Sequence, residues 1–161
     1  MTDISASGGN GAPQQPTGQL VVNAQYVKDF SFENPRAPQS LMPQAQAPEI
    51  KLDINVNAQN LAPDVFEVLL SISARATRKD DLIFLVELTY AAVVTLQGVA
   101  RDQAQFLVLV ETPRLIFPFA RAILADATRD GGFPPLFIHP IDFAELLRRQ
   151  QKAPPTPVGN A

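Results

Sequence analysis

The fold is decided by residues 102–147, which read DQAQFLVLVETPRLIFPFARAILADATRDGGFPPLFIHPIDFAELL. The pattern predicts a long helix that begins at Thr112, because Thr112 can cap the N-terminus and Pro113 suits the first helical position. The pair Gly131-Gly132 supplies the signal that ends the helix. The stretch therefore contains one long helix, a connection that follows it and a short final segment.

Three polar residues of this predicted helix fall on one narrow line, and Asp126 and Arg129 add polarity near its C-terminal end. Arg114 and Arg121 are separated by two helical turns, and Thr128 continues the same line. Nearly every other position is apolar, including Phe117, Phe119 and Ile123. A surface helix needs only one apolar stripe, so a helix with this pattern has to be covered on at least two sides.

Composition limits the class of protein. The chain has 161 residues, a formal net charge of −3 and no basic run, which argues against a nucleic-acid partner. It has no cysteine, which excludes disulfides and thiolate chemistry and fits a cytoplasmic location. The most apolar window, residues 106–124, contains Glu111, two arginines and two prolines, so we expect no membrane insertion.

Both ends of the chain are expected to lie outside the folded unit. Residues 1–18 are rich in Gly, Pro, Gln and Ser, and they lack the basic start and apolar run of a signal peptide. Residues 152–161 have a similar composition. We therefore expect two disordered tails and one folded domain over residues 19–151.

Four segments before the helix have the alternation of apolar and polar residues that predicts β-strands. The later three cover residues 50–57, 66–77 and 82–96, and RKDD at residues 78–81 has hairpin length. The first strand is predicted to place these residues on one face, with Lys28 as an exception: Leu20, Val22, Ala24, Tyr26, Phe30 and Phe32. Polar connections with no helix between the strands predict one antiparallel sheet.

The predicted fold class is α+β, with a four-stranded antiparallel sheet followed by a long helix, a crossover loop and a short C-terminal helix. One sheet offers a single apolar face to a helix that needs two covers. We therefore expect an oligomer in which helices from several subunits lie between sheets of opposite subunits. The alternative is that the loops of the same chain wrap the helix.

The segment after the helix, FPPLFIHP at residues 133–140, holds too many prolines for regular structure. Asp142 is a candidate N-cap for the short amphipathic helix that follows. An extended apolar connection can form one wall of a binding groove, or it can be ordinary core beneath a long crossover. The candidate groove residues, with two from the loop after the first strand, are Leu41, Met42, Phe133, Leu136, Phe137, Ile138, Phe143, Leu146 and Leu147.

The sequence contains no recognisable catalytic or metal-binding pattern. His139 is the single histidine, and no cysteine or carboxylate pair stands near it at ligand spacing. Asp80-Asp81 and Asp126/Asp130 are spaced as carboxylate pairs, but a turn and a helix end normally carry solvated charges. Nucleophile, phosphate-loop and dinucleotide motifs are absent. We expect no enzymatic activity, no metal and no cofactor.

Four stretches resemble one protein family in sequence, order and spacing. They are YVKDFSFENP at 26–35, PEIKLDI at 48–54, LIFLVEL at 82–88 and PRLIFPFARAILADATRDGGFPPLFIHPIDF at 113–143. Together they resemble the SecB protein-export chaperones of Gram-negative bacteria, and the likeness covers residues 19–151. The chain departs from the family at residues 44–49, QAQAPE, because the family often has a tryptophan just before the second strand.

The resemblance implies a homotetramer, a dimer of dimers in which helices are layered between antiparallel sheets. It also implies a chaperone without nucleotide or enzymatic activity, which binds unfolded precursor proteins and delivers them to the SecA motor ATPase. By position, the residues matching the SecA contacts are Asp29, Glu33, Leu85 and Glu87. The residues expected at subunit interfaces are Val86, Leu88 and Tyr90 by resemblance, with Phe117, Phe119 and Ile123 from the helix.

Two other classes of protein fit the same pattern. A carrier of small apolar ligands would bind a lipid stoichiometrically and would ignore denatured proteins. A purely structural oligomer would bind neither small apolar ligands nor denatured proteins. The mechanism that we expect is passive holding, in which several weak apolar contacts along an extended client add up.

Overall fold

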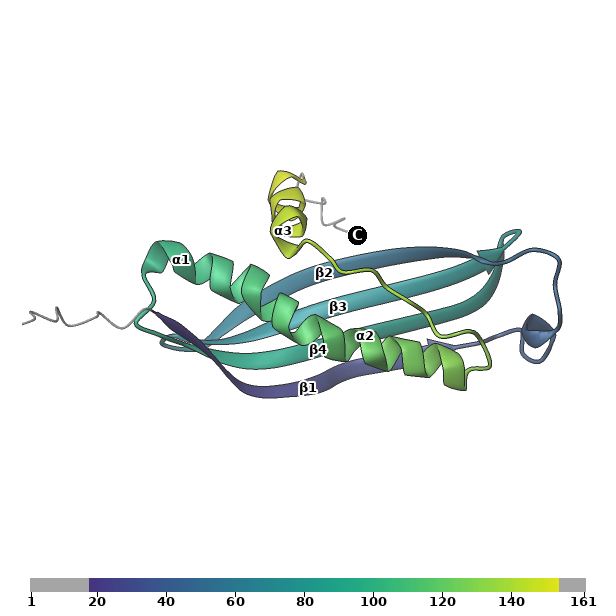
Figure 1. The fold of residues 1–161 in the computed structure, drawn as a ribbon, viewed down its shortest axis with the longest axis horizontal. Helices are drawn as coiled ribbons and strands as arrows, with labels where there is room; N and C mark the ends of the chain where they lie inside the picture. The colour runs from purple at the N-terminus through teal and green to yellow at the C-terminus, as the bar shows by residue number, and fades with distance from the viewer. Residues whose placement is uncertain (1–17, 154–161) are drawn as a thin grey trace, which may run out of the picture.

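The structure is a computed structural model that describes residues 18–153, so most of the two predicted tails lies outside the described residues. Four strands form one antiparallel sheet in the order β1-β4-β3-β2 (Figure 1). The elements of the sheet are β1 (Gln19–Glu33), β2 (Glu49–Ala62), β3 (Val65–Arg78) and β4 (Asp81–Gln97), with the 3-10 turn η1 (Gln39–Leu41) after β1. The predicted fold class and the antiparallel sheet are confirmed.

The predicted hairpin between the third and fourth strands is also confirmed. Lys79 and Asp80 join β3 to β4, and both have positive φ angles, 47° and 68°. A two-residue loop with both central residues in this conformation matches the right-handed twist of the strands beside it. The turn between β2 and β3 consists of Pro63 and Asp64, and only Asp64 has a positive φ, 60°.

Strand β1 departs from the predicted alternation. Register shifts at residues 22–24 and 27–29 mark two β-bulges in its pairing with β4. One extra residue moves the following side chains to the other face of the sheet. Ala24 and Tyr26 therefore lie on the face opposite Leu20, and their predicted place on the apolar face is wrong.

One continuous helical segment crosses a single face of the sheet (Figure 1). It consists of α1 (Arg101–Phe106), a π-helical turn η2 (Leu107–Glu111) and α2 (Thr112–Asp130). The predicted start at Thr112 is wrong, because the helix already begins at Arg101. The predicted end at Gly131-Gly132 is confirmed, and Gly132 has a φ of 91°.

The π-helical turn explains why Thr112 and Pro113 stand inside a helix. The Thr112 N–H bonds to the Leu107 carbonyl, five residues back, and the Thr112 hydroxyl donates to the same oxygen at 2.9 Å. Pro113 has no N–H, and in a regular helix its ring clashes with the preceding turn. A wider turn directly before the proline relieves this clash.

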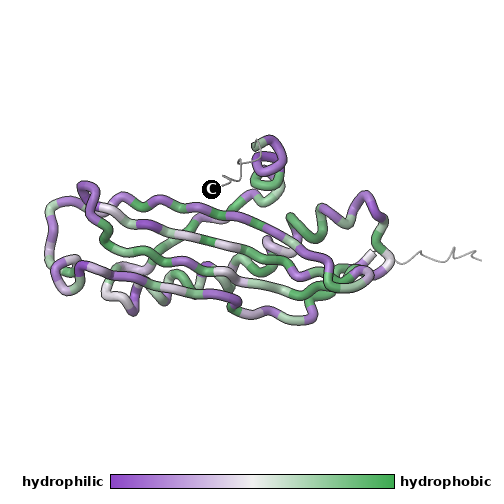
Figure 2. The backbone as a smooth tube through the Cα atoms, turned by 180° about the vertical axis from the view of Figure 1, so that it is seen from behind, coloured by the Kyte–Doolittle hydropathy of each residue, from purple (hydrophilic) through white to green (hydrophobic). Residues whose placement is uncertain are grey.

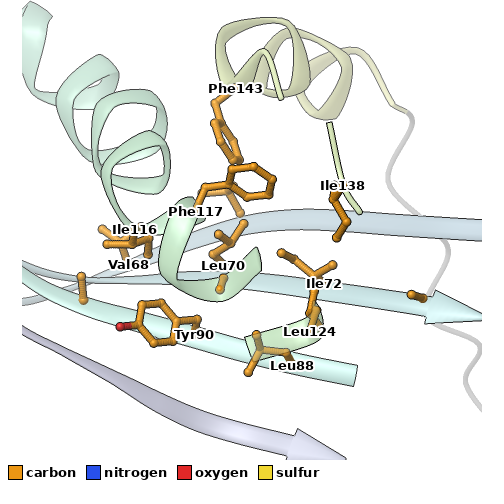
Figure 3. Packing of buried hydrophobic residues seen from close by; sticks show 14 of the residues in the cluster. Val68, Leu70, Ile72, Leu88, Tyr90, Ile116, Phe117, Leu124, Ile138 and Phe143 are labelled. Atoms are coloured by element: carbon orange, nitrogen blue, oxygen red, sulfur yellow. The ribbon is translucent and has the colours of Figure 1, made fainter. Parts of the chain in front are cut away.

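The core lies between the sheet and the helix, as Figure 3 shows from close by. Leu70 and Ile72 of β3 face Ile116 and Leu124 of α2, and each of the four is at most 1% exposed. Burial of such a side chain stabilises the fold by roughly 1.5–3 kcal/mol. Figure 2 shows the sheet from behind, where polar and apolar residues alternate along strands that no helix of residues 18–153 covers.

After α2 the chain crosses the same face of the sheet without regular structure and then forms α3 (Phe143–Lys152) (Figure 1). The buried N–H of Leu136 donates to the Thr128 hydroxyl at 2.8 Å, which ties this crossover to α2. Asp142 caps α3 by accepting the Glu145 N–H at 3.0 Å, as predicted. No helix among residues 18–153 is long and apolar enough to cross a membrane.

Candidate binding surfaces

An apolar groove lies where the loop after β1 meets the crossover after α2. The groove encloses about 1260 Å³, including space that is open to solvent. One wall comes from Leu41 and the loop prolines Pro43 and Pro48, and the other comes from residues 133–137. Ile50, at the start of β2, also lines the groove.

Large apolar side chains stand exposed along this groove. Phe137 is 67% exposed, Leu41 is 45% exposed and Ile50 is 42% exposed. Beneath them, the ring of Phe133 packs on Phe84 with centroids 5.0 Å apart, which gives the groove a firm floor. Contiguous exposed apolar surface of this kind usually marks a binding site for protein or ligand.

The predicted groove residues fall into three groups. Leu41, Phe133, Leu136 and Phe137 line the groove, and Met42, which is 57% exposed, follows Leu41 in the same loop. Ile138 and Phe143 are 2% and 3% exposed and belong to the core of the single chain (Figure 3).

The remaining predicted groove residues, Leu146 and Leu147, are half-buried on α3. Leu147 lines a second hollow of about 860 Å³, together with Phe66, Val108 and Leu109. The structure therefore places α3 beside this second hollow and away from the loop after β1.

Sequence reasoning missed part of the groove. Pro43 and Pro48 fall in the predicted loop, and Ile50 and Phe84 fall on the apolar sides of two predicted strands. The signal for the prolines was their place beside Leu41 in the sequence. Ile50 gave no such signal, because alternation does not reveal which end of a strand the helix leaves uncovered.

A second surface lies on the face of the sheet that is turned away from the helix. On this face Glu33 pairs with Leu85, the next pair is Ser31 with Glu87, and the pair after that is Asp29 with Thr89. Asp29, Glu33 and Glu87 are exposed, and Leu85 is half-buried beside Glu33 and Glu87. The structure thus places these four predicted residues on one face of the neighbouring strands β1 and β4; we call them the acidic face.

A covered carboxylate lies on the same side of the sheet. Glu67 of β3 is only 5% exposed, and it accepts hydrogen bonds from the Lys28 ammonium at 2.7 Å and the Tyr26 hydroxyl at 2.5 Å. The side-chain amide of Gln59 donates to its other oxygen. These donors, Lys28 first, lower the pKa of Glu67 to about 2, and the bond to Glu67 raises the pKa of Tyr26.

The predicted interface residues lie in two different environments. Val86, Leu88 and Tyr90 are 0%, 2% and 8% exposed, because the helix of the same chain covers them. On the helix, Phe117 is buried and Ile123 is half-buried, whereas Phe119 is 52% exposed.

Two further apolar residues of the helical segment are exposed, and sequence reasoning did not single them out. Leu115 is 50% exposed and shares a face with Phe119, four residues later. Phe106 is 48% exposed at the end of α1, ahead of the start that was predicted for the helix.

Side chains that could hold a metal ion are not grouped in the described part of the chain. Within residues 18–153, no cluster of three or more His, Cys, Asp or Glu side chains has a suitable arrangement. The ring of His139 instead packs edge-on against Phe137, with centroids 5.1 Å apart.

Relatives of known description match almost the whole chain. The family model described as "Preprotein translocase subunit SecB" matches residues 12–154. The protein-export protein SecB of Rhodospirillum centenum is 53% identical over 155 residues, covering 93% of this chain and 92% of that protein. The protein-export protein SecB of Maricaulis maris is 52% identical, covering 93% and 87%.

A solved structure has the same fold. It is a SecB-like chaperone of Mycobacterium tuberculosis in complex with a peptide from an antitoxin, with a TM-score of 0.62 and 16% sequence identity. The match covers 76% of this chain and 90% of that chain. Because the family model spans the described fold and the relatives share half of their residues with it, this chain belongs to the SecB family of protein-export chaperones.

Proposed function

We propose that this chain holds unfolded precursor proteins in the cytoplasm, without ATP, and delivers them to the SecA motor for export. The functional unit is the domain over residues 19–151, and it has no enzymatic activity of its own. The observation that carries the proposal is the apolar groove, where Leu41, Ile50 and Phe137 stay exposed at the end of the sheet.

Holding follows from the shape and chemistry of the groove. An extended client segment that covers these side chains removes apolar surface from water, which stabilises the complex by roughly 25 cal/mol per Å². Prolines stand in both walls, at Pro43 and Pro48 in the loop and at Pro134 and Pro135 in the crossover. Because proline restricts the backbone, the walls lose little conformational entropy when a client binds.

Release of the client does not use ATP in this proposal. A holdase binds the unfolded state of its client and so competes with client folding by mass action. Several shallow contacts, each weak, let a client slide out segment by segment. The client leaves when SecA binds the chaperone or when the motor pulls on the chain.

The acidic face is the proposed docking surface for SecA. Asp29, Glu33 and Glu87 are exposed on the same sheet face as Leu85, and no helix among residues 18–153 covers that face. Such a surface attracts a basic or metal-bearing segment by electrostatics and adds one apolar contact at its centre. The affinity for the motor is expected to fall as the salt concentration rises.

The proposed assembly is a homotetramer, a dimer of dimers with helices layered between sheets. Leu115 and Phe119 support it, because each is about half exposed on the side of α2 that the sheet does not cover. Val86, Leu88 and Tyr90 lie beneath the helix, so their proposed part in assembly is to set the position of the helix on the sheet.

A pair of variants tests the two surfaces separately. The measurements are the refolding rate of an unfolded precursor without nucleotide and the affinity of the chaperone for SecA. Phe137→Asp should lose about tenfold or more in client affinity, because a charge then replaces apolar surface, and should still bind SecA. Glu87→Arg should hold clients normally and bind SecA more weakly.

Leu61→Asp is the matched control for the groove, because Leu61 is also a largely exposed apolar residue (53%, against 67% for Phe137) and lies at the other end of β2. It should hold clients as well as the unmodified chain does. If the unmodified protein fails to slow refolding, the chaperone function is wrong. If it instead binds a small apolar ligand stoichiometrically, the function is that of a carrier.

A further inference from the structure

Lys28 and Asp29 follow one another on β1, yet both side chains lie on the uncovered face of the sheet, which is the face turned away from the helix. The pairing with β4 skips Lys28, which is the extra residue of the bulge between Val27 and Asp29. In a regular strand consecutive side chains point to opposite faces, and a bulge removes this separation. A cation of the chain therefore lies directly beside Asp29, one of the residues of the acidic face.

The ammonium of Lys28 is bound on β3 and not by its neighbour in the sequence. Its Nζ donates to the carboxylate of Glu67 at 2.7 Å, and this contact crosses β4, which lies between β1 and β3 (Figure 1). Asp29 makes no salt bridge with any residue in the range 18–153. The cation is thus paired with a carboxylate outside the acidic face, and the acid beside it stays available to a partner.

Glu67 is held in position to bind this cation. Its side chain is only 7% exposed, whereas that of Lys28 is 44% exposed, so the carboxylate is the covered member of the pair. The Tyr26 hydroxyl donates to the same oxygen at 2.5 Å, and the side-chain amide of Gln59 donates to the other oxygen. A carboxylate with donors on both oxygens is fixed in place and stays ionised.

We propose that Glu67 is a positioning residue for motor docking, which keeps Asp29 free by holding the Lys28 ammonium on β3. The proposal rests on the proposed function, since it requires that the motor binds the acidic face. Without Glu67, the ammonium competes with a basic group of the motor for Asp29, and a neighbour in the same chain competes at a high effective concentration. The pair that it forms leaves only Glu33 and Glu87 to attract a basic segment.

The test measures the affinity of SecA for variants of this network at low salt. Glu67→Gln should weaken the binding about two- to fivefold, because the Lys28 ammonium then pairs with Asp29. Glu67→Gln with Lys28→Gln should restore the affinity to within about twofold of the unmodified protein, because the competing cation is gone. This rescue separates the release of Lys28 from a general loosening of β1, since the double variant still lacks the ion pair that joins the strands.

A second comparison shows whether the effect passes through Asp29. Asp29→Asn should itself weaken the binding of SecA, and Glu67→Gln added to it should cause less than about a twofold further loss. Glu49→Gln is the matched control and should leave the affinity nearly unchanged, because it removes the same charge from an exposed glutamate of the same face. Glu67→Asp keeps the charge on a shorter side chain. It should show a smaller loss in the same direction, which covers the case in which Glu67→Gln does not fold.

Client holding depends on the opposite face of the sheet, so the refolding assay shows for each variant that the fold is intact. An unchanged affinity for SecA in Glu67→Gln would overturn the proposal. A loss that Lys28→Gln does not rescue, or a loss of the same size with and without Asp29→Asn, would overturn it as well and leave Glu67 a structural role alone. If neither Asp29→Asn nor Glu87→Arg weakens the binding, the acidic face is not the docking surface, and the proposed function of that face is wrong.

Discussion

Glu67 joins three strands on the uncovered face of the sheet. It lies on β3, and its partners are Tyr26 and Lys28 on β1 and Gln59 on β2. Tyr26 reaches across β4 because the residue that it pairs with, Ala91, is small. The carboxylate therefore holds β1 to the middle of the sheet in addition to the backbone ladder.

The folded protein should lose part of its stability in acid through Glu67. The pKa of this carboxyl is about 2 in the folded state, against 4.5 for the free group. The contribution is complete above pH 4.5 and is lost as the pH falls toward 2. Glu67→Gln should lower the free energy of unfolding by about 1–3 kcal/mol at pH 7, and this difference should shrink below pH 4.5.

Urea unfolding as a function of pH checks this prediction. Glu49→Gln is the matched control, because Glu49 is an exposed glutamate of β2 on the same face of the sheet. A constant difference between Glu67→Gln and the unmodified chain from pH 7 to pH 3 would contradict the assigned role of the carboxylate.

At the level of single residues, one position in the sequence hints at this network, although the network itself is not predicted. Lys28 interrupts the apolar alternation of β1, and it was predicted as an exception on the apolar face. The bulges at residues 22–24 and 27–29 decide where these side chains point. Period-two reasoning cannot place a bulge, because the bulge depends on pairing with β4 and not on the strand alone.

The helical segment and the crossover form one element, because α2 holds the chain that follows it. Thr128 is fully buried, and its hydroxyl donates to carbonyls of the preceding helical turn while it accepts the N–H of Leu136. This bond fixes the point at which the crossover turns back over the sheet. The wall of the groove at residues 133–137 depends on it.

Thr128→Val should therefore destabilise the protein and loosen the groove. Valine keeps the shape of threonine but leaves the buried Leu136 N–H without an acceptor, which costs about 1–3 kcal/mol. The urea midpoint should fall, and client holding should weaken. Thr128→Ser keeps the hydroxyl and should retain the bond, so equal effects of the two variants would contradict this explanation.

Sequence reasoning predicted the end of the long helix but not its start. Gly131-Gly132 ends it for a local reason, since glycine readily adopts the positive φ found at Gly132. Thr112 and Pro113 have the signature of a helix start, yet they follow a π-helical turn within the helix. A wide turn has no sequence signature of its own, so the capping rule was the only local guide.

The whole molecule leaves apolar surface that one chain does not cover. Leu115 and Phe119 of α2 and Phe106 of α1 are each about half exposed. The sheet covers the other side of the same helix, which agrees with the expectation that this helix needs two covers.

Charges introduced on the uncovered side of α2 should make the proposed tetramer dissociate. Leu115→Asp with Phe119→Asp should lower the native mass below four copies of the 17.5 kDa chain, because unpaired charges in an apolar interface are costly. Native mass spectrometry gives the result, and Leu61→Asp should leave the mass unchanged. A mass of one chain for the unmodified protein would exclude the tetramer.

At this scale the sequence predicted the layers better than the sites. The antiparallel sheet, its apolar face for the helix and the extended crossover all follow from alternation and from proline, whereas the pairing of β1 with β4 does not. The predicted groove residues are divided among the groove, the hollow beside Leu147 and the core, because the division depends on where α3 lies. That position is set by tertiary contacts such as Phe143 on Phe117, with ring centroids 5.8 Å apart.

Strand β4 carries neighbouring residues of both proposed surfaces. Phe84 lies at the floor of the groove, and Leu85 points out through the opposite face of the sheet. Under the proposed roles, cargo and motor thus approach from opposite sides of one backbone. A chaperone with a bound client therefore leaves the acidic face as exposed as an empty chaperone does. Transfer to the motor can then pass through a ternary complex of chaperone, client and motor, which forms before the client is released.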